Sequence, residues 1–123
     1  MGSEQAVVPN LDRTIHEPAR LAIMSVLHSV DQVDFSYLLA VLSLSRGNLS
    51  SHMGKLCEAG YVDVSKQFIG NVPNTSYSMT AAGRAALEEY WRLLDGLRAS
   101  KGARARRRLG EVADGRLLAE RGR

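Results

Sequence analysis

The chain has 123 residues, 45% of them hydrophobic, which is enough for one domain with a modest core and a short extension but not for two packed domains. Its formal net charge of +3 is compatible with a nucleic-acid partner. Residues 99–123 hold eight Lys or Arg against three Asp or Glu, an excess of +5, so the first 98 residues carry a net charge of −2. The basic character therefore belongs to the C-terminal tail.

Cysteine content and hydropathy indicate a cytoplasmic protein. The single cysteine, Cys57, can form neither an intramolecular disulfide nor a paired-thiolate metal site. Residues 1–10 lack the basic start and apolar segment of a secretory signal, and the longest aliphatic run, residues 38–42, is too short to span a membrane. We expect a cytoplasmic location, no membrane contact, no metal and no cofactor.

The start of the chain predicts a flexible lead-in followed by one helix. Residues 1–13 are polar and mixed without a clear period, although Leu11 and Ile15 could anchor this segment. Proline suits the first turn of a helix, because its missing N–H would have no intrahelical partner there, and this places the helix start near Pro18. Apolar residues recur at helical spacing from there to Val30, so one face of the helix should lie in the core.

Two further helices follow, with only a few residues between them. Asp34 and Ser45 are both suited to cap a first helical turn, and an apolar pattern of helical period follows each of them. Gly60 can adopt the left-handed conformation that ends a helix. The close spacing is that of a helix-turn-helix, whose second member is the recognition helix.

The second half of the chain predicts a β-hairpin and a long helix. Alternating patterns in residues 61–65 and 75–79 indicate two strands, and the turn formers in residues 70–74 indicate a hairpin with a long tip. Thr80 then caps a last helix with a broad apolar stripe. The predicted fold is mainly α with a small β-hairpin.

Three parts of the chain are expected on this basis. Residues 1–13 form a flexible N-terminal segment, and residues 14–98 form the folded domain. Glycines interrupt the arginine-rich residues 99–123, so we expect this tail to be disordered, with a non-specific contact to phosphates as the open alternative.

The outer face of the third predicted helix carries the strongest functional signal. With Leu49, Met53, Leu56 and Cys57 turned inward, the opposite side presents short hydroxyls, amides and cations. These side chains are Arg46, Gly47, Ser50, Ser51, Gly54, Lys55 and Glu58, with Asn48 and His52 at the flank. Such a surface can enter a major groove closely, donate to phosphates and read base edges, whereas the alternative is an ordinary solvated helix face.

Residues 44–62, LSRGNLSSHMGKLCEAGYV, resemble the recognition helix and following strand of winged-helix regulators related to the MarR and ArsR groups. Residues 79–87, MTAAGRAAL, are similar to the opening of the last helix in this family, and Pro73 and Thr75 agree in the hairpin. The resemblance covers roughly residues 11–97, with its motifs in the same order and at the same spacing. It implies a winged helix-turn-helix with a three-helix core, a β-hairpin wing and a long C-terminal helix.

The resemblance also implies a function, namely sequence-specific binding of double-stranded DNA by a homodimeric transcriptional regulator, with repression as the expected mode. The recognition helix would lie in the major groove, and the wing would reach the backbone or the adjacent minor groove. The DNA-binding residues expected are Ser45, Arg46, Asn48, Ser50, Ser51 and Lys55 in the helix and Lys66, Asn71, Asn74 and Thr75 in the wing. Many relatives carry Lys or Arg in the wing, whereas this tip offers amides, including Gln67, so wing affinity should be weaker and less salt-dependent.

The apolar stripe of the last helix is broader than one small domain needs to cover, which predicts a homodimer interface. The interface residues expected are Leu11, Ile15, Leu87, Tyr90, Trp91, Leu94 and Leu97. An intramolecular cover, with the stripe folded back on the first helix, is the alternative. A further alternative is that an apolar pocket near Trp91 binds a small-molecule effector.

The sequence offers little support for catalysis or for a redox switch. His16, His28 and His52 are scattered, and no motif places a nucleophile beside a base, so we expect no catalytic activity. A redox switch at Cys57 is an alternative, but its apolar neighbours favour an inert thiol.

The rival from another class is a winged helix that has lost DNA binding and docks protein partners. The net charge of the first 98 residues and the neutral wing favour it, whereas Arg46, Lys55 and the Ser-Arg-Gly-Asn-Leu-Ser run oppose it.

Overall fold

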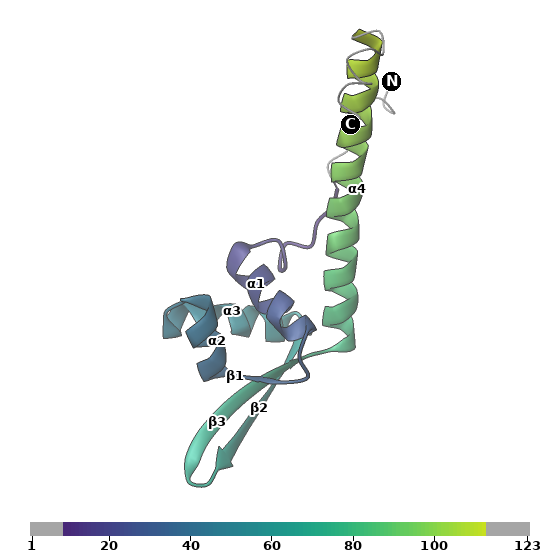
Figure 1. Ribbon diagram of the computed structural model, residues 1–123. Helices are drawn as coiled ribbons and strands as arrows, with labels where there is room; N and C mark the ends of the chain where they lie inside the picture. The colour runs from purple at the N-terminus through teal and green to yellow at the C-terminus, as the bar shows by residue number, and fades with distance from the viewer. Residues whose placement is uncertain (1–8, 113–123) are drawn as a thin grey trace. The chain divides into compact units, whose positions relative to one another are not determined.

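The computed structural model describes residues 9–112, and the side chains of residues 9–99. Within the described residues the elements are α1 (Pro18–His28), β1 (Val33–Asp34), α2 (Phe35–Leu42), α3 (Arg46–Glu58), β2 (Val62–Ile69), β3 (Val72–Met79) and α4 (Ala81–Val112) (Figure 1). Residues 10–90 form one compact unit, and α4 from Trp91 onward belongs to a second one. The element order confirms the predicted winged helix-turn-helix, which is mainly α with a hairpin wing.

Local capping explains where the helices begin. Pro18 occupies the first turn of α1, and the carboxylate of Glu17 accepts a hydrogen bond from the backbone N–H of Arg20 at 2.8 Å, which lowers the pKa of Glu17. The Ser45 hydroxyl accepts from the backbone N–H of Asn48 at 3.1 Å at the start of α3. The Thr80 hydroxyl likewise accepts from the backbone N–H of Gly83 in the first turn of α4, at 2.9 Å, so the predicted starts at Pro18, Ser45 and Thr80 are confirmed. Asp34 precedes α2 as predicted, but its side chain makes no capping hydrogen bond there.

The core of the 10–90 unit lies where the helices meet the sheet. Its apolar side chains with at most 2% exposure are Ile15, Ile23, Met24, Leu27, Leu38, Leu49, Met53, Leu56, Val62 and Leu87. Apart from Ile15, which lies in the turn before α1, they come from every helix of the unit and from β2. The apolar face of each helix is therefore buried against the other elements.

The hairpin differs from its predicted form. Ile69 pairs with Val72, so the strands close on a two-residue turn, in which Gly70 has a φ of +67°. Pro73 therefore lies within β3, in a stretch that β1 does not reach, and its missing N–H faces no neighbouring strand there. The sequence predicts a long tip because proline and asparagine favour turns, but cross-strand pairing with β2 prevails.

The sheet contains a third strand that the sequence did not indicate. Its order is β1-β3-β2, and β1 contributes only two residues, with Val33 opposite Tyr77 and Asp34 opposite Ser76. A strand of two residues has no period to detect, so only its partner defines it.

The last helix continues beyond its predicted end. α4 includes residues 99–112 of the segment expected to be disordered, because the Ala, Arg and Leu residues there are good helix formers that offset the glycines. Residues 113–123, the rest of that tail, lie outside the described residues, as do residues 1–8. No helix in the described part of the chain is long and apolar enough to cross a membrane.

Candidate nucleic-acid interface

A short, well-defined turn presents α3 to solvent. Ser43, after α2, adopts the left-handed conformation with a φ of 55°, and Ser45 then caps α3. Buried Leu49, Met53 and Leu56 hold one face of α3 in the core. The opposite face is therefore fixed in orientation by packing as well as by the turn.

All six residues predicted on this helix are exposed, namely Ser45, Arg46, Asn48, Ser50, Ser51 and Lys55. The Arg46 guanidinium lies 5.5 Å from the ring centroid of Phe35 at the start of α2, a cation–π contact that orients the cation beside the first turn of α3. Gly47 and Gly54 leave open space on this side. The resulting surface is narrow, polar and cationic at its edges, as close approach to base edges requires.

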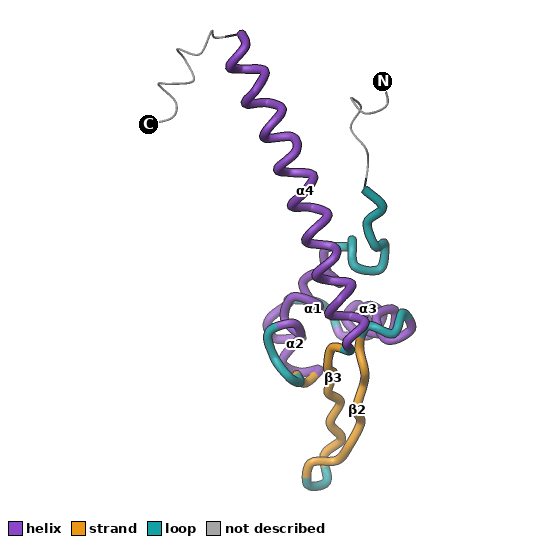
Figure 2. Tube along the Cα trace, turned by 90° about the vertical axis from the view of Figure 1, so that its right-hand side faces the viewer, coloured by secondary structure: helices purple, strands orange, loops and turns teal. Residues whose placement is uncertain are grey.

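Of the four residues predicted to contact DNA from the wing, two are exposed and two are half-buried. The β2–β3 hairpin extends away from α1, α2 and α3 (Figure 2), with Lys66 and Asn71 exposed along it. Asn74 is half-buried, and its amide donates to the Asp34 carboxylate at 3.4 Å, which ties the hairpin to the start of α2. Thr75 is also half-buried.

The wing tip is apolar, although the residue pattern of the hairpin predicts a polar turn. Phe68, Ile69 and Val72 are 71%, 61% and 65% exposed. Phe68 pairs with Pro73 on one face of the hairpin and Ile69 with Val72 on the other, so both faces of the tip are apolar. The sequence could have indicated this apolar tip through the three large apolar residues around Gly70. The neighbouring turn-forming residues instead favoured a polar loop.

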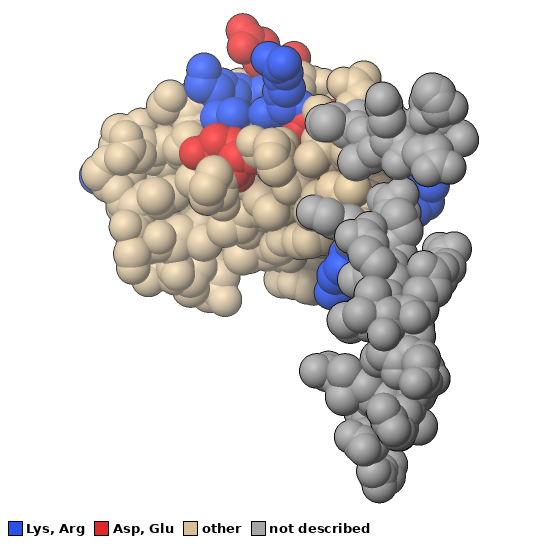
Figure 3. Space-filling model, turned by 90° about the horizontal axis from the view of Figure 1, so that it is seen from above, with Lys and Arg blue, Asp and Glu red and all other residues tan. Residues whose placement is uncertain are grey.

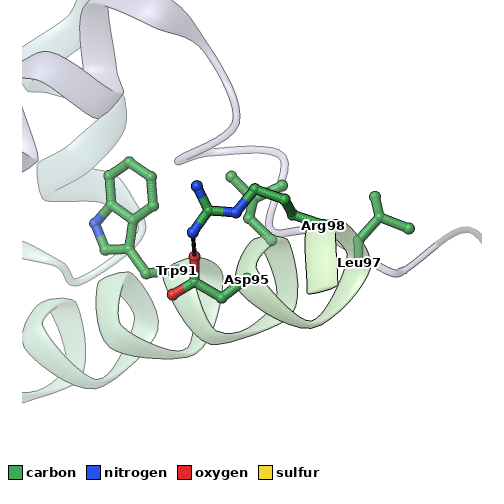
Figure 4. A pocket seen from close by; sticks show the side chains of 5 residues that line it. Trp91, Asp95, Leu97 and Arg98 are labelled. Atoms are coloured by element: carbon green, nitrogen blue, oxygen red, sulfur yellow. Dashed lines mark hydrogen bonds and ion pairs between the residues drawn. The ribbon is translucent and has the colours of Figure 1, made fainter. Parts of the chain in front are cut away.

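The second unit offers a separate apolar face on α4. Trp91, which is 42% exposed, lies with Leu94 and Leu97 beside an open hollow of about 460 Å³, together with the Asp95–Arg98 ion pair at 3.2 Å (Figure 4). Two more residues of the predicted interface, Leu87 and Tyr90, are buried, as is Ile15, and Leu11 is half-buried. The apolar surface left on α4 is therefore smaller than the stripe seen in the sequence.

Cys57 is in an environment that suppresses thiol chemistry. It is partly buried, and this burial raises the pKa of the Cys57 thiol, which the nearby Asp63 carboxylate raises further. A raised pKa lowers the thiolate fraction, so the structure favours the inert thiol over the redox switch. Among the described residues there is no group of three or more His, Cys, Asp or Glu that could hold a metal ion.

Comparison with known proteins gives concordant matches. A family model described as a winged helix DNA-binding domain matches residues 19–97. An uncharacterized protein of Methanocaldococcus jannaschii is 35% identical over 71 residues, which are 58% of this chain and 77% of that protein. A transcriptional regulator homologue from Pyrococcus horikoshii has a similar structure, with a TM-score of 0.68 and 29% identity over 72% of this chain and 88% of that one. A transcriptional regulator of the MarR family from Enterococcus faecalis is similar in fold, with a TM-score of 0.63 and 18% identity over 80% of this chain and 97% of that one.

Proposed function

Because this chain belongs to the family of winged helix DNA-binding domains, we propose that it is a sequence-specific transcriptional regulator that binds double-stranded DNA as a homodimer. It acts as a binding protein without catalytic activity. Helix α3 enters the major groove, and the β2–β3 hairpin contacts the backbone or the adjacent minor groove.

The exposed face of α3 is the observation that carries this proposal. Asn48, Ser50 and Ser51 offer amide and hydroxyl groups that can hydrogen-bond to base edges, and Arg46 and Lys55 can contact phosphate or guanine. None of these five side chains is buried, and the glycines between them leave room for the nucleic acid.

A dimer supplies the specificity that one helix lacks. A single recognition helix contacts only a few base pairs, whereas a two-fold pair reads two half-sites about one helical turn apart. The exposed apolar face of α4, with Trp91, Leu94 and Leu97, is suited to join two copies. We favour repression as the mode of regulation. A protein that occupies an operator can block transcription by its presence alone, whereas an activator also needs a surface that contacts the polymerase.

The test begins with selection of bound duplexes from a random pool, followed by mobility shifts on the selected sequence. Asn48→Ala and Ser51→Ala should each alter base preference at one half-site position and cost about 1–3 kcal/mol of binding free energy per lost base contact. Ser25→Ala removes an exposed hydroxyl from α1 and serves as the matched control. If both α3 variants discriminate as the parent does, α3 is not the reader.

A second candidate is a winged helix that docks a protein in place of DNA. The exposed apolar wing tip and the net charge of −2 over residues 1–98 favour it. The same experiment separates the two, because a protein-docking module would select no common sequence and form no specific complex at either low or moderate salt.

A further inference from the structure

A hollow lies beside α3, on the flank away from the hairpin. It has a volume of about 370 Å³, and its lining residues are Arg13, Thr14, Arg20, Lys55, Glu58 and Ala59. Three cations and one carboxylate therefore line it, with a net charge of +2. Figure 3 shows Lys and Arg side chains gathered beside Asp and Glu at one edge of the face seen from above.

The segment that carries Arg13 is held in place by its neighbours. The Asp12 carboxylate accepts hydrogen bonds from the backbone N–H groups of Thr14 at 2.9 Å and Ile15 at 3.3 Å, which closes a tight turn. The Tyr61 hydroxyl donates to the other Asp12 oxygen, and this bond raises the pKa of Tyr61 to about 12. Ile15 is fully buried. Arg13 thus lies in an anchored turn.

Arg20 connects this turn to α3. Its Nε donates to the Thr14 carbonyl at 2.6 Å, and its guanidinium donates to Nδ1 of His52, on α3, at 3.1 Å. Arg13 and Lys55 differ from Arg20, since both are exposed and neither has a hydrogen-bond or ion-pair partner among the described side chains. Arg13 and Lys55 are therefore available to a ligand, and the hydrogen bonds of Arg20 hold their two chain segments together.

The position of Lys55 on the helix indicates which ligand this is. At about 100° per residue, Lys55 lies about 200° around α3 from Cys57, whose thiol is close to Asp63 of β2. The hairpin and the Arg13–Lys55 pair therefore lie on opposite flanks of α3, and exposed Ser51 lies on the surface between them. A helix in a major groove has one phosphate backbone along each flank.

We propose that Arg13 and Lys55 bind neighbouring phosphates of the DNA backbone, one each, on the flank of α3 opposite the wing. This inference rests on the proposed function and adds a second backbone contact to it. Glu58 lowers the positive charge of the hollow, which weakens its attraction for a small free anion. A polyanion is still attracted, because the fields of its many phosphates add together.

Salt dependence tests the proposal in the full chain. Arg13→Gln should weaken binding to the selected operator and to random duplex alike, leave base preference unchanged, and reduce the slope of log K against log salt by about 0.9. Arg84→Gln removes the same charge from an exposed position at the start of α4 and is the matched control, with an unchanged slope. The double variant with Lys55→Gln should lose about twice as much slope while keeping the parent's thermal unfolding.

Three outcomes would overturn the proposal. If the parent binds a specific operator but Arg13→Gln has the same salt slope as Arg84→Gln, this inference fails and the proposed function stands. If the parent forms no specific complex, both fail. If inorganic phosphate alone binds the parent in calorimetry, and Arg13→Gln abolishes this without changing the DNA slope, the hollow is a site for a small anion.

Discussion

At the scale of single residues, Gly83 occupies a position that tolerates no side chain. It lies in the first turn of α4, where its N–H donates to the Thr80 hydroxyl, and a Cβ atom there would stand 2.2 Å from the backbone oxygen of Tyr61. That oxygen also accepts from the N–H of Thr80 at 3.0 Å, so it cannot move away without loss of the contact that joins the start of α4 to the residue before β2. The glycine therefore permits the close approach of two backbone segments.

Gly83→Ala should lower the free energy of unfolding by about 1–3 kcal/mol, the usual cost of overpacking, as measured by urea denaturation. Gly54→Ala is the matched control, because a Cβ at that helical position meets nothing within 4 Å. There the same substitution should raise the free energy of unfolding by about 0.5–1 kcal/mol through the better helix propensity of alanine. A stabilised Gly83→Ala protein would contradict the close contact.

At the scale of elements, the two flanks of α3 differ in chemistry. One flank offers Arg13 and Lys55, whereas the wing on the other side has a single cation, Lys66, and an apolar tip. Apolar side chains can contact sugars or enter base steps in the minor groove without displacing counterions. The apolar tip of the wing should then contribute binding affinity that depends little on salt concentration.

Phe68→Ser should weaken DNA binding by about tenfold, corresponding to about 1.4 kcal/mol of lost apolar burial, with an unchanged salt slope. Because Phe68 is 71% exposed, the free energy of unfolding should change by less than about 0.5 kcal/mol. Lys66→Gln is the counterpart on the same strand, and it should reduce the salt slope by about 0.9. Equal affinity of Phe68→Ser and the parent would show that the tip stays clear of DNA.

At the scale of the whole molecule, the proposed assembly depends on α4. Leu94→Glu places a charge in the apolar face beside Trp91, and desolvating it in an interface would be costly, so this variant should be a folded monomer that no longer binds the operator. Light scattering measures the mass, and circular dichroism measures the fold. Ala85→Glu introduces the same charge about 180° away from Leu94 around α4, at an exposed position, and should leave the dimer intact. A parent that is monomeric at micromolar concentration, with and without DNA, would reject this assembly.

Much of the fold could be predicted from the sequence because its signals are local. Pro18, Ser45 and Thr80 satisfy or remove the free N–H groups of a first helical turn, and the periods of the apolar residues show which helix faces are buried. The winged-helix resemblance of residues 44–62 and 79–87 is confirmed by the family match. The exposed polar face of α3 also follows from periodicity alone, and its role in DNA binding stays a prediction.

Only the tertiary structure decided the features that depend on distant partners. Pro73 belongs to a strand because β2 pairs with it, although its own preference is for a turn, and β1 exists only through its pairing with β3. Arg13 falls in a segment that the sequence predicts to be flexible, yet Asp12, Tyr61 and buried Ile15 hold it beside α3. Helix caps and apolar periods depend on a few neighbouring residues, so they can be recognised in the sequence. Strand pairing and contacts between distant charged side chains form only when separate chain segments fold together, so a single sequence does not reveal them.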